Sequence, residues 1–100
     1  EVLVDDPNYV FFAETGQKVV ISPNPTDGVF KVEMTGMPNR GTLLPIEIYD
    51  GAGRLVQYNK MVRYDATYYG HFSLLNEPVG VYYLRIVDQG INRLLRIVKQ

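Results

Sequence analysis

Apolar and polar residues alternate with a period of two along most of this 100-residue chain, and this pattern constrains its fold more than any other feature. Phe30, Val32 and Met34 alternate with polar neighbours, and Leu44 and Ile46 begin a second run of the same kind. Such alternation predicts strands with one buried and one exposed face. No window has the spacing of an amphipathic helix, so the chain is expected to be all-β.

Turn-forming residues separate these runs at intervals of about 8–12 residues, which is typical of an antiparallel β-sandwich or barrel. We predict a sandwich of about seven strands, and their ranges are 18–22, 28–34, 43–50, 54–62, 70–75, 80–88 and 92–98. Residues 9–13 are predicted to form an eighth strand or an edge strand. Leu94 and Leu95 interrupt the alternation of the last strand, so we expect either two covered faces or a bulge there.

Composition excludes several classes of function. A chain that is 46% hydrophobic and 21% charged is typical of one globular domain, and a net charge of −1 argues against nucleic-acid binding. The absence of cysteine removes disulfides, thiolate metal sites and cysteine nucleophiles. No apolar run approaches the ~20 residues of a membrane span, so no membrane insertion is expected. No cofactor is implied.

Catalytic chemistry finds little support in the residues. The one histidine, His71, shares a strand face with Ser73 and follows Asp65, but nothing resembles the turn that presents a nucleophilic serine. Aspartates in the turns are expected to bond their own backbone rather than calcium. We therefore predict that the chain is not an enzyme.

Tyrosines leave a second interpretation open. Tyr58, Tyr64, Tyr68 and Tyr69 surround one predicted loop, and exposed aromatic rings could stack against sugar rings. A carbohydrate-binding module or a structural spacer of a secreted enzyme is therefore the alternative.

Residues 23–28 predict a stiff corner. Pro23 and Pro25 fix the backbone and remove two amide donors, Asn24 is pushed into an extended conformation, and Gly28 can take a positive φ. We expect an exposed corner that carries the chain from one sheet to the other and that a partner could grip at little entropic cost.

Four short motifs stand in order along the chain. They are Pro23-Asn24-Pro25 with Gly28, the run Ile48-Tyr49-Asp50-Gly51-Ala52-Gly53-Arg54-Leu55-Val56, the trio Pro78, Gly80 and Tyr82, and the ending Arg96-Ile97-Val98-Lys99. Together they resemble the type A C-terminal sorting domain of the bacterial type IX (Por) secretion system. The resemblance covers about residues 18–100, and leaves 1–17 as a linker or N-terminal extension that includes the edge strand at 9–13.

The resemblance implies an immunoglobulin-like sandwich that acts as a secretion signal. In this family an N-terminally attached cargo passes through the periplasm of a Gram-negative bacterium, and the sorting domain engages the outer-membrane translocon. In many members a sortase then cuts ahead of the domain and attaches the cargo to the cell surface, while other cargo is released outside the cell. This chain would be the substrate of that sortase.

The basic final strand suggests how a partner could bind. Arg93, Arg96 and Lys99 would present an edge or a basic tip to the secretion apparatus, and strand addition at an open edge is a general binding mode. On this hypothesis, deletion of residues 97–100 abolishes export and leaves the upstream fold largely intact. The same open edges would allow a weak edge-strand dimer.

Overall fold

The computed structural model describes residues 9–12, 17–37, 39, 41–87 and 94–100. Eight strands form in these ranges: β1 (Tyr9–Phe12), β2 (Gln17–Ser22), β3 (Val29–Thr35), β4 (Leu43–Asp50), β5 (Leu55–Tyr64), β6 (Thr67–Ser73), β7 (Gly80–Ile86) and β8 (Leu94–Lys99). Within the described part of the chain, no helical segment could span a membrane.

The predicted strands are present with small changes at their ends. β5 continues to Tyr64 and β6 begins at Thr67, so the hairpin between them is tighter than the sequence pattern indicated. The segment predicted at 9–13 forms the short edge strand β1, which pairs with β2. Residues 13, 88, 92 and 93 of three predicted strands, and most of the predicted linker at 1–17, lie outside the described residues.

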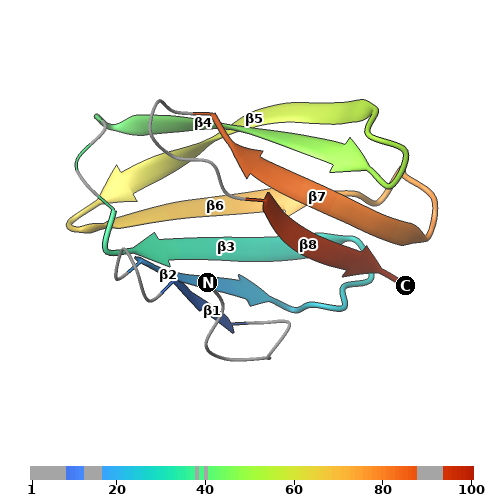
Figure 1. Cartoon of the computed structure of the whole chain (residues 1–100), viewed down its shortest axis with the longest axis horizontal. Helices are drawn as coiled ribbons and strands as arrows, with labels where there is room; N and C mark the ends of the chain where they lie inside the picture. The colour runs from blue at the N-terminus through green and yellow to red at the C-terminus, as the bar shows by residue number, and fades with distance from the viewer. Residues whose placement is uncertain (1–8, 13–16, 38, 40, 88–93) are drawn as a thin grey trace.

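All strands belong to one antiparallel sheet that curls on itself. Its order is β1-β2-β3-β6-β5-β4-β7-β8. β5 pairs with β4 along most of its length but with β6 only through its last three residues, so the sheet bends at β5 and its two halves face each other. Figure 1 shows β1, β2 and β3 along one side and β4 and β5 along the other. The predicted all-β, immunoglobulin-like antiparallel sandwich is confirmed.

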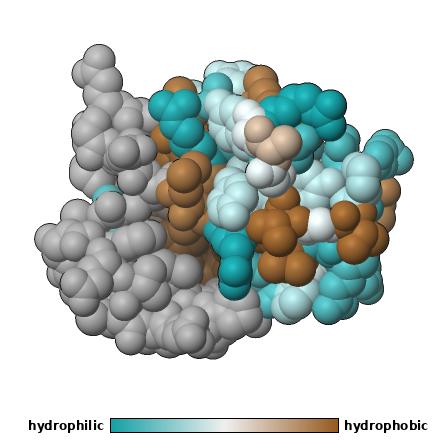
Figure 2. Space-filling view, turned by 45° about the vertical axis from the view of Figure 1, so that its right-hand side comes forward, coloured by the Kyte–Doolittle hydropathy of each residue, from teal (hydrophilic) through white to brown (hydrophobic). Residues whose placement is uncertain are grey.

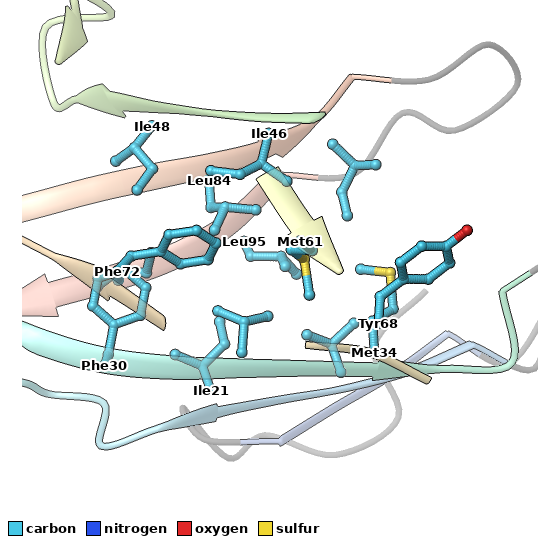
Figure 3. Packing of buried hydrophobic residues seen from close by; sticks show 14 of the residues in the cluster. Ile21, Phe30, Met34, Ile46, Ile48, Met61, Tyr68, Phe72, Leu84 and Leu95 are labelled. Atoms are coloured by element: carbon cyan, nitrogen blue, oxygen red, sulfur yellow. The ribbon is translucent and has the colours of Figure 1, made fainter. Parts of the chain in front are cut away.

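The core follows from the alternation of the sequence. In β3 the odd-numbered side chains are exposed or half-buried and the even-numbered ones are buried, and β4 repeats the arrangement as far as Tyr49. Inward side chains from both halves of the sheet meet in one cluster, which includes Phe30, Ile46, Met61, Phe72 and Leu84 (Figure 3). One apolar layer between the sheet halves therefore holds the sandwich together.

Two details of the predicted fold are wrong. The corner at 23–28 does not cross between sheets, because β2 and β3 are antiparallel neighbours from Lys18↔Thr35 to Ser22↔Lys31. The final strand has neither two covered faces nor a bulge, since its register with β7 is continuous and Leu94 is simply 62% exposed. Local residue types did not reveal that β3 would be the neighbour of β2, or that Leu94 would keep the alternation by staying exposed.

Candidate functional site

The corner between β2 and β3 is half-buried rather than exposed. Pro23, Pro25 and Asp27 face solvent, whereas Asn24 is 3% and Thr26 1% exposed. Both peptide bonds that precede the prolines are cis. The prediction that the whole corner is exposed is therefore wrong, because every second residue of it is buried. The buried side chains of Asn24 and Thr26 need hydrogen-bond partners.

Thr26 and Gly28 set the shape of this corner. The Thr26 hydroxyl accepts a hydrogen bond from the Gly28 amide at 3.0 Å and donates one to the Val29 carbonyl at 2.8 Å. Gly28 has a φ of 146°, and a Cβ at this position would lie 2.6 Å from Leu75 Cδ2. A residue without a side chain is therefore required where the corner meets the β6–β7 loop.

The corner docks on the outer edge of β8. The Asn24 side-chain amide donates to the Arg96 carbonyl at 2.9 Å and accepts from the Val98 amide at 2.9 Å. The Thr26 amide donates to the Val98 carbonyl, and the Gln100 amide donates to the Thr26 carbonyl, both at 2.8 Å. The corner thus takes the place of a neighbouring strand along the last part of β8.

Lys99 is a structural residue and not part of a basic tip. Its side chain is directed inward, the residue is 8% exposed, and its ammonium donates to the carbonyls of Leu75, at 3.2 Å, and of Glu77. The predicted open edge and basic tip are therefore corrected at this strand end. The Arg96 residue is exposed, and Arg93 lies outside the described residues.

The start of β7 completes the same end of the molecule. Tyr82 is buried as predicted, and its hydroxyl donates to the Pro78 carbonyl at 2.5 Å. Burial, reinforced by the nearby carboxylates of Glu77 and Asp50, raises the pKa of Tyr82 above 10.0. Gly80 pairs with Lys99 across the β7–β8 ladder.

The structure brings all ten predicted motif residues together at one end of the sandwich. They are Pro23, Asn24, Pro25, Gly28, Gly80, Tyr82, Arg96, Ile97, Val98 and Lys99. We call this assembly, formed by residues 23–28, 74–82 and 96–100, the terminal hub; it occupies the right-hand end in Figure 1.

Sequence reasoning missed Thr26 and the backbone of the β6–β7 loop. Thr26 lies between a proline and an Asp-Gly turn, which is a signal for a hydroxyl that bonds its own turn. The Leu74 amide donates to the Gly28 carbonyl at 2.7 Å. This contact joins two main-chain groups, so no residue type in the sequence predicts it.

The remaining motif forms the turn between β4 and β5. Asp50 Oδ1 accepts from the amides of Ala52 and Arg54, at 3.0 and 2.9 Å, and its Oδ2 lies 3.1 Å from Arg54 Nε. The bond from the Arg54 amide is the largest cause that lowers the pKa of Asp50 below 3.8. Gly53 takes the positive φ of 83° that the turn requires.

The groups considered for catalysis are spread apart. His71 and Ser73 lie on the exposed face of β6, and Asp65 is in the β5–β6 turn. His71 is four residue steps along β6 from Thr67, which is next to that turn, and this amounts to about 13 Å. Among the described residues, no three His, Cys, Asp or Glu side chains are grouped so that they could hold a metal ion.

The tyrosines divide between core and surface. Tyr68 is fully buried and its hydroxyl donates to the Gly41 carbonyl at 2.7 Å, so it cannot stack on a ligand. Tyr58, Tyr64 and Tyr69 remain exposed.

Comparison with known proteins places the chain in a family. No curated protein matches the chain. Residues 20–100 match the family described as the secretion system C-terminal sorting domain, and the match includes every motif residue of the terminal hub. Because it spans about four fifths of the sequence, the chain belongs to the C-terminal sorting domains of the type IX secretion system.

Proposed function

We propose that this domain targets an N-terminally attached cargo to the type IX translocon, which exports the cargo across the outer membrane. The convergence of the family's motif residues in the terminal hub supports this proposal most directly. Paired hydrogen bonds hold together segments that are up to 74 residues apart in the sequence. They form one preformed surface to which a partner could bind. Recognition is then conformational, because the surface exists only in the folded domain.

Two later steps belong to the same proposal. The cargo passes through the periplasm and ends at the cell surface or outside the cell. A sortase cuts ahead of the domain, within or near the extension at 1–17, and attaches part of the cargo population to the surface. The domain at 18–100 acts as a signal and partner in these steps, not as a catalyst.

An export assay tests the proposal. Residues 1–100 are placed behind a signal peptide and a fluorescent reporter in a bacterium that has the type IX apparatus, and in the same host without the translocon. The proposal predicts reporter outside the first host and periplasmic reporter in the second. Periplasmic reporter in both hosts, with the fused domain folded, would refute it.

Carbohydrate binding is a second candidate, which the exposure of Tyr58, Tyr64 and Tyr69 favours. Tyr69 pairs with Val62 of β5, and Val62 is two residues from Tyr64 on the same face of that strand. Tyr64 and Tyr69 therefore share one surface. A glycan array probed with the purified domain would detect such binding, and its loss in a Tyr64→Ala, Tyr69→Ala variant would assign it to this face.

A further inference from the structure

A shallow cleft of about 340 Å³ lies beside the terminal hub, between the β4–β5 turn and the β6–β7 loop. Residues 50–52 and 54 line one wall, and residues 77–82 line the other. Figure 2 brings this end of the molecule toward the viewer and shows hydrophobic patches set among hydrophilic side chains. The cleft shares Pro78, Gly80 and Tyr82 with the hub, so the motif residues shape its wall.

Two glycines, Gly51 and Gly80, leave the main chain of the cleft wall accessible. A Cβ built on Gly80 would meet no heavy atom within 4 Å, and one on Gly51 would meet only the Val81 carbonyl oxygen, at 3.5 Å. Gly80 also has a φ of 157°, which an L side chain rarely adopts. An extended segment of another chain can therefore approach the main chain of the wall closely.

Apolar side chains form the rim. Val79 is 72% exposed and Val81 is 37% exposed, and both line the cleft. A single exposed valine is ordinary on a protein surface. Val79 and Val81, however, lie on either side of Gly80, whose main chain is accessible, and together they provide an apolar contact for a side chain of a bound segment.

The charge of the cleft is negative. Asp50 and Glu77 line it with carboxylates, and Arg54, the basic residue of the lining, is paired with Asp50 at 3.1 Å. The Glu77 carboxylate makes no ion pair with any described residue. Lys99 bonds the loop through main-chain carbonyls and does not line the cleft. A cation that enters the cleft would thus meet a carboxylate that has no ion-pair partner among the described residues.

We propose that this cleft docks an extended segment of the secretion apparatus in which a basic side chain is adjacent to an apolar one. The basic group lies against Glu77, the apolar group contacts Val79 and Val81, and the segment's backbone passes over Gly80. This inference rests on the proposed secretion function and identifies the part of the domain that contacts the apparatus.

The export assay described above tests this proposal when substitutions are made in the cleft. Val79→Asp removes the apolar contact and Glu77→Lys reverses the charge, and each is expected to lower export at least about fivefold, as loss of an interface anchor does. Both positions are on the surface loop, so the thermal midpoint of each purified variant is expected to match the wild type.

Two matched substitutions elsewhere serve as controls. Val62→Asp changes a valine that is 48% exposed on the outer face of β5, and Glu33→Lys reverses an acid that is paired with Lys31 at 3.5 Å. Both controls are expected to export like the wild type. Val79→Ser and Glu77→Gln repeat the test with smaller changes, should the first pair unfold the domain.

The outcomes separate the two proposals. Wild-type export that depends on the translocon, with cleft variants exported as well as the controls, would overturn the docking site and leave the secretion function intact. Absence of wild-type export would overturn the secretion function and the docking site with it. A selective loss in the folded cleft variants is the expected result.

Discussion

Asn24 satisfies two main-chain groups of β8 with the two ends of its side-chain amide. It donates to the Arg96 carbonyl and accepts from the Val98 amide, in a setting where Asn24 is 3% exposed. Removal of one partner from a buried hydrogen bond costs more than the bond contributes, because the group left behind has lost its water. Asn24 is therefore expected to be among the most sensitive polar positions of the domain.

We predict that Asn24→Ala lowers the free energy of unfolding by about 2–3 kcal/mol, because a donor and an acceptor of β8 are left unpaired. Asn59→Ala is the matched control, since the Asn59 amide bonds only Gln57 and the backbone of Lys60 at an exposed site. It should change stability by less than about 0.5 kcal/mol. Urea titration of both variants checks this, and equal losses would contradict the role of Asn24.

Residue patterns predicted the direction of most side chains but not their long-range partners. Tyr82 was expected to point inward because it shares a face with Leu84 and Ile86, and it does. Lys99 was expected to belong to a basic tip of the final strand, yet it is 8% exposed. Its burial depends on two carbonyls of the β6–β7 loop, more than 20 residues away, and no local pattern encodes that contact.

At the level of elements, the corner, the β6–β7 loop and β8 stabilise one another. Gly28 accepts a hydrogen bond from Leu74 and packs against Leu75, while Lys99 bonds the same loop from β8. The corner also covers main-chain groups that β8 would otherwise expose at a sheet edge. A change in any one of the three elements should therefore reach the other two.

Gly28→Ala is expected to destabilise the domain by about 1–3 kcal/mol, because a side chain at this φ is strained and would press on Leu75. Gly51→Ala provides the control, since its Cβ would make one ordinary contact at 3.5 Å and no positive φ is required. Thermal unfolding of the two variants measures the loss of stability that each substitution causes. An equally mild effect of both substitutions would mean that the corner is looser than described.

The β4–β5 turn should give the domain an acid-sensitive contribution to stability. The folded-state pKa of Asp50 is below 3.8, so its carboxylate stabilises the fold above that pH, and the contribution is lost as the pH falls through the folded-state pKa. Asp50→Asn should be less stable than the wild type near pH 7, and the difference should shrink below pH 3.8. Unfolding titrations at several pH values test this, and a constant difference would contradict it.

Elements were more predictable than their arrangement. Alternation fixed the faces of β3 and β4, and the glycine and aspartate signals located the β4–β5 turn. The corner was recognised as a stiff connection, yet its assignment to a sheet crossing was wrong. The docking of the corner on β8 depends on contacts such as Thr26 with Lys99, which are separated by most of the chain.

At the level of the whole molecule, the last residues complete the sandwich. Ile97 is fully buried in the core, Val98 and Gln100 bond the corner, and Lys99 bonds the β6–β7 loop. The hypothesis that residues 97–100 can be removed without harm to the upstream fold is therefore revised. Export that fails in such a deletion would not by itself identify a recognition site.

We expect deletion of residues 97–100 to lower the thermal midpoint by more than about 15 °C or to prevent folding, since about 4 kcal/mol of core and hydrogen-bond energy is lost in a domain of this size. Circular dichroism melts of the full and shortened chains measure this. A shortened chain that melts within a few degrees of the full one would restore the earlier hypothesis of a detachable basic tip.

Amide hydrogen exchange tests most directly whether the corner and the last strand form one hub. The account predicts slow exchange at Thr26, Val98 and Gln100, close to that of the central strand residue Val32, because all three amides donate to partners across the hub. Exchange at these three amides as fast as at Ala52, in the exposed β4–β5 turn, while Val32 stays protected, would contradict the account.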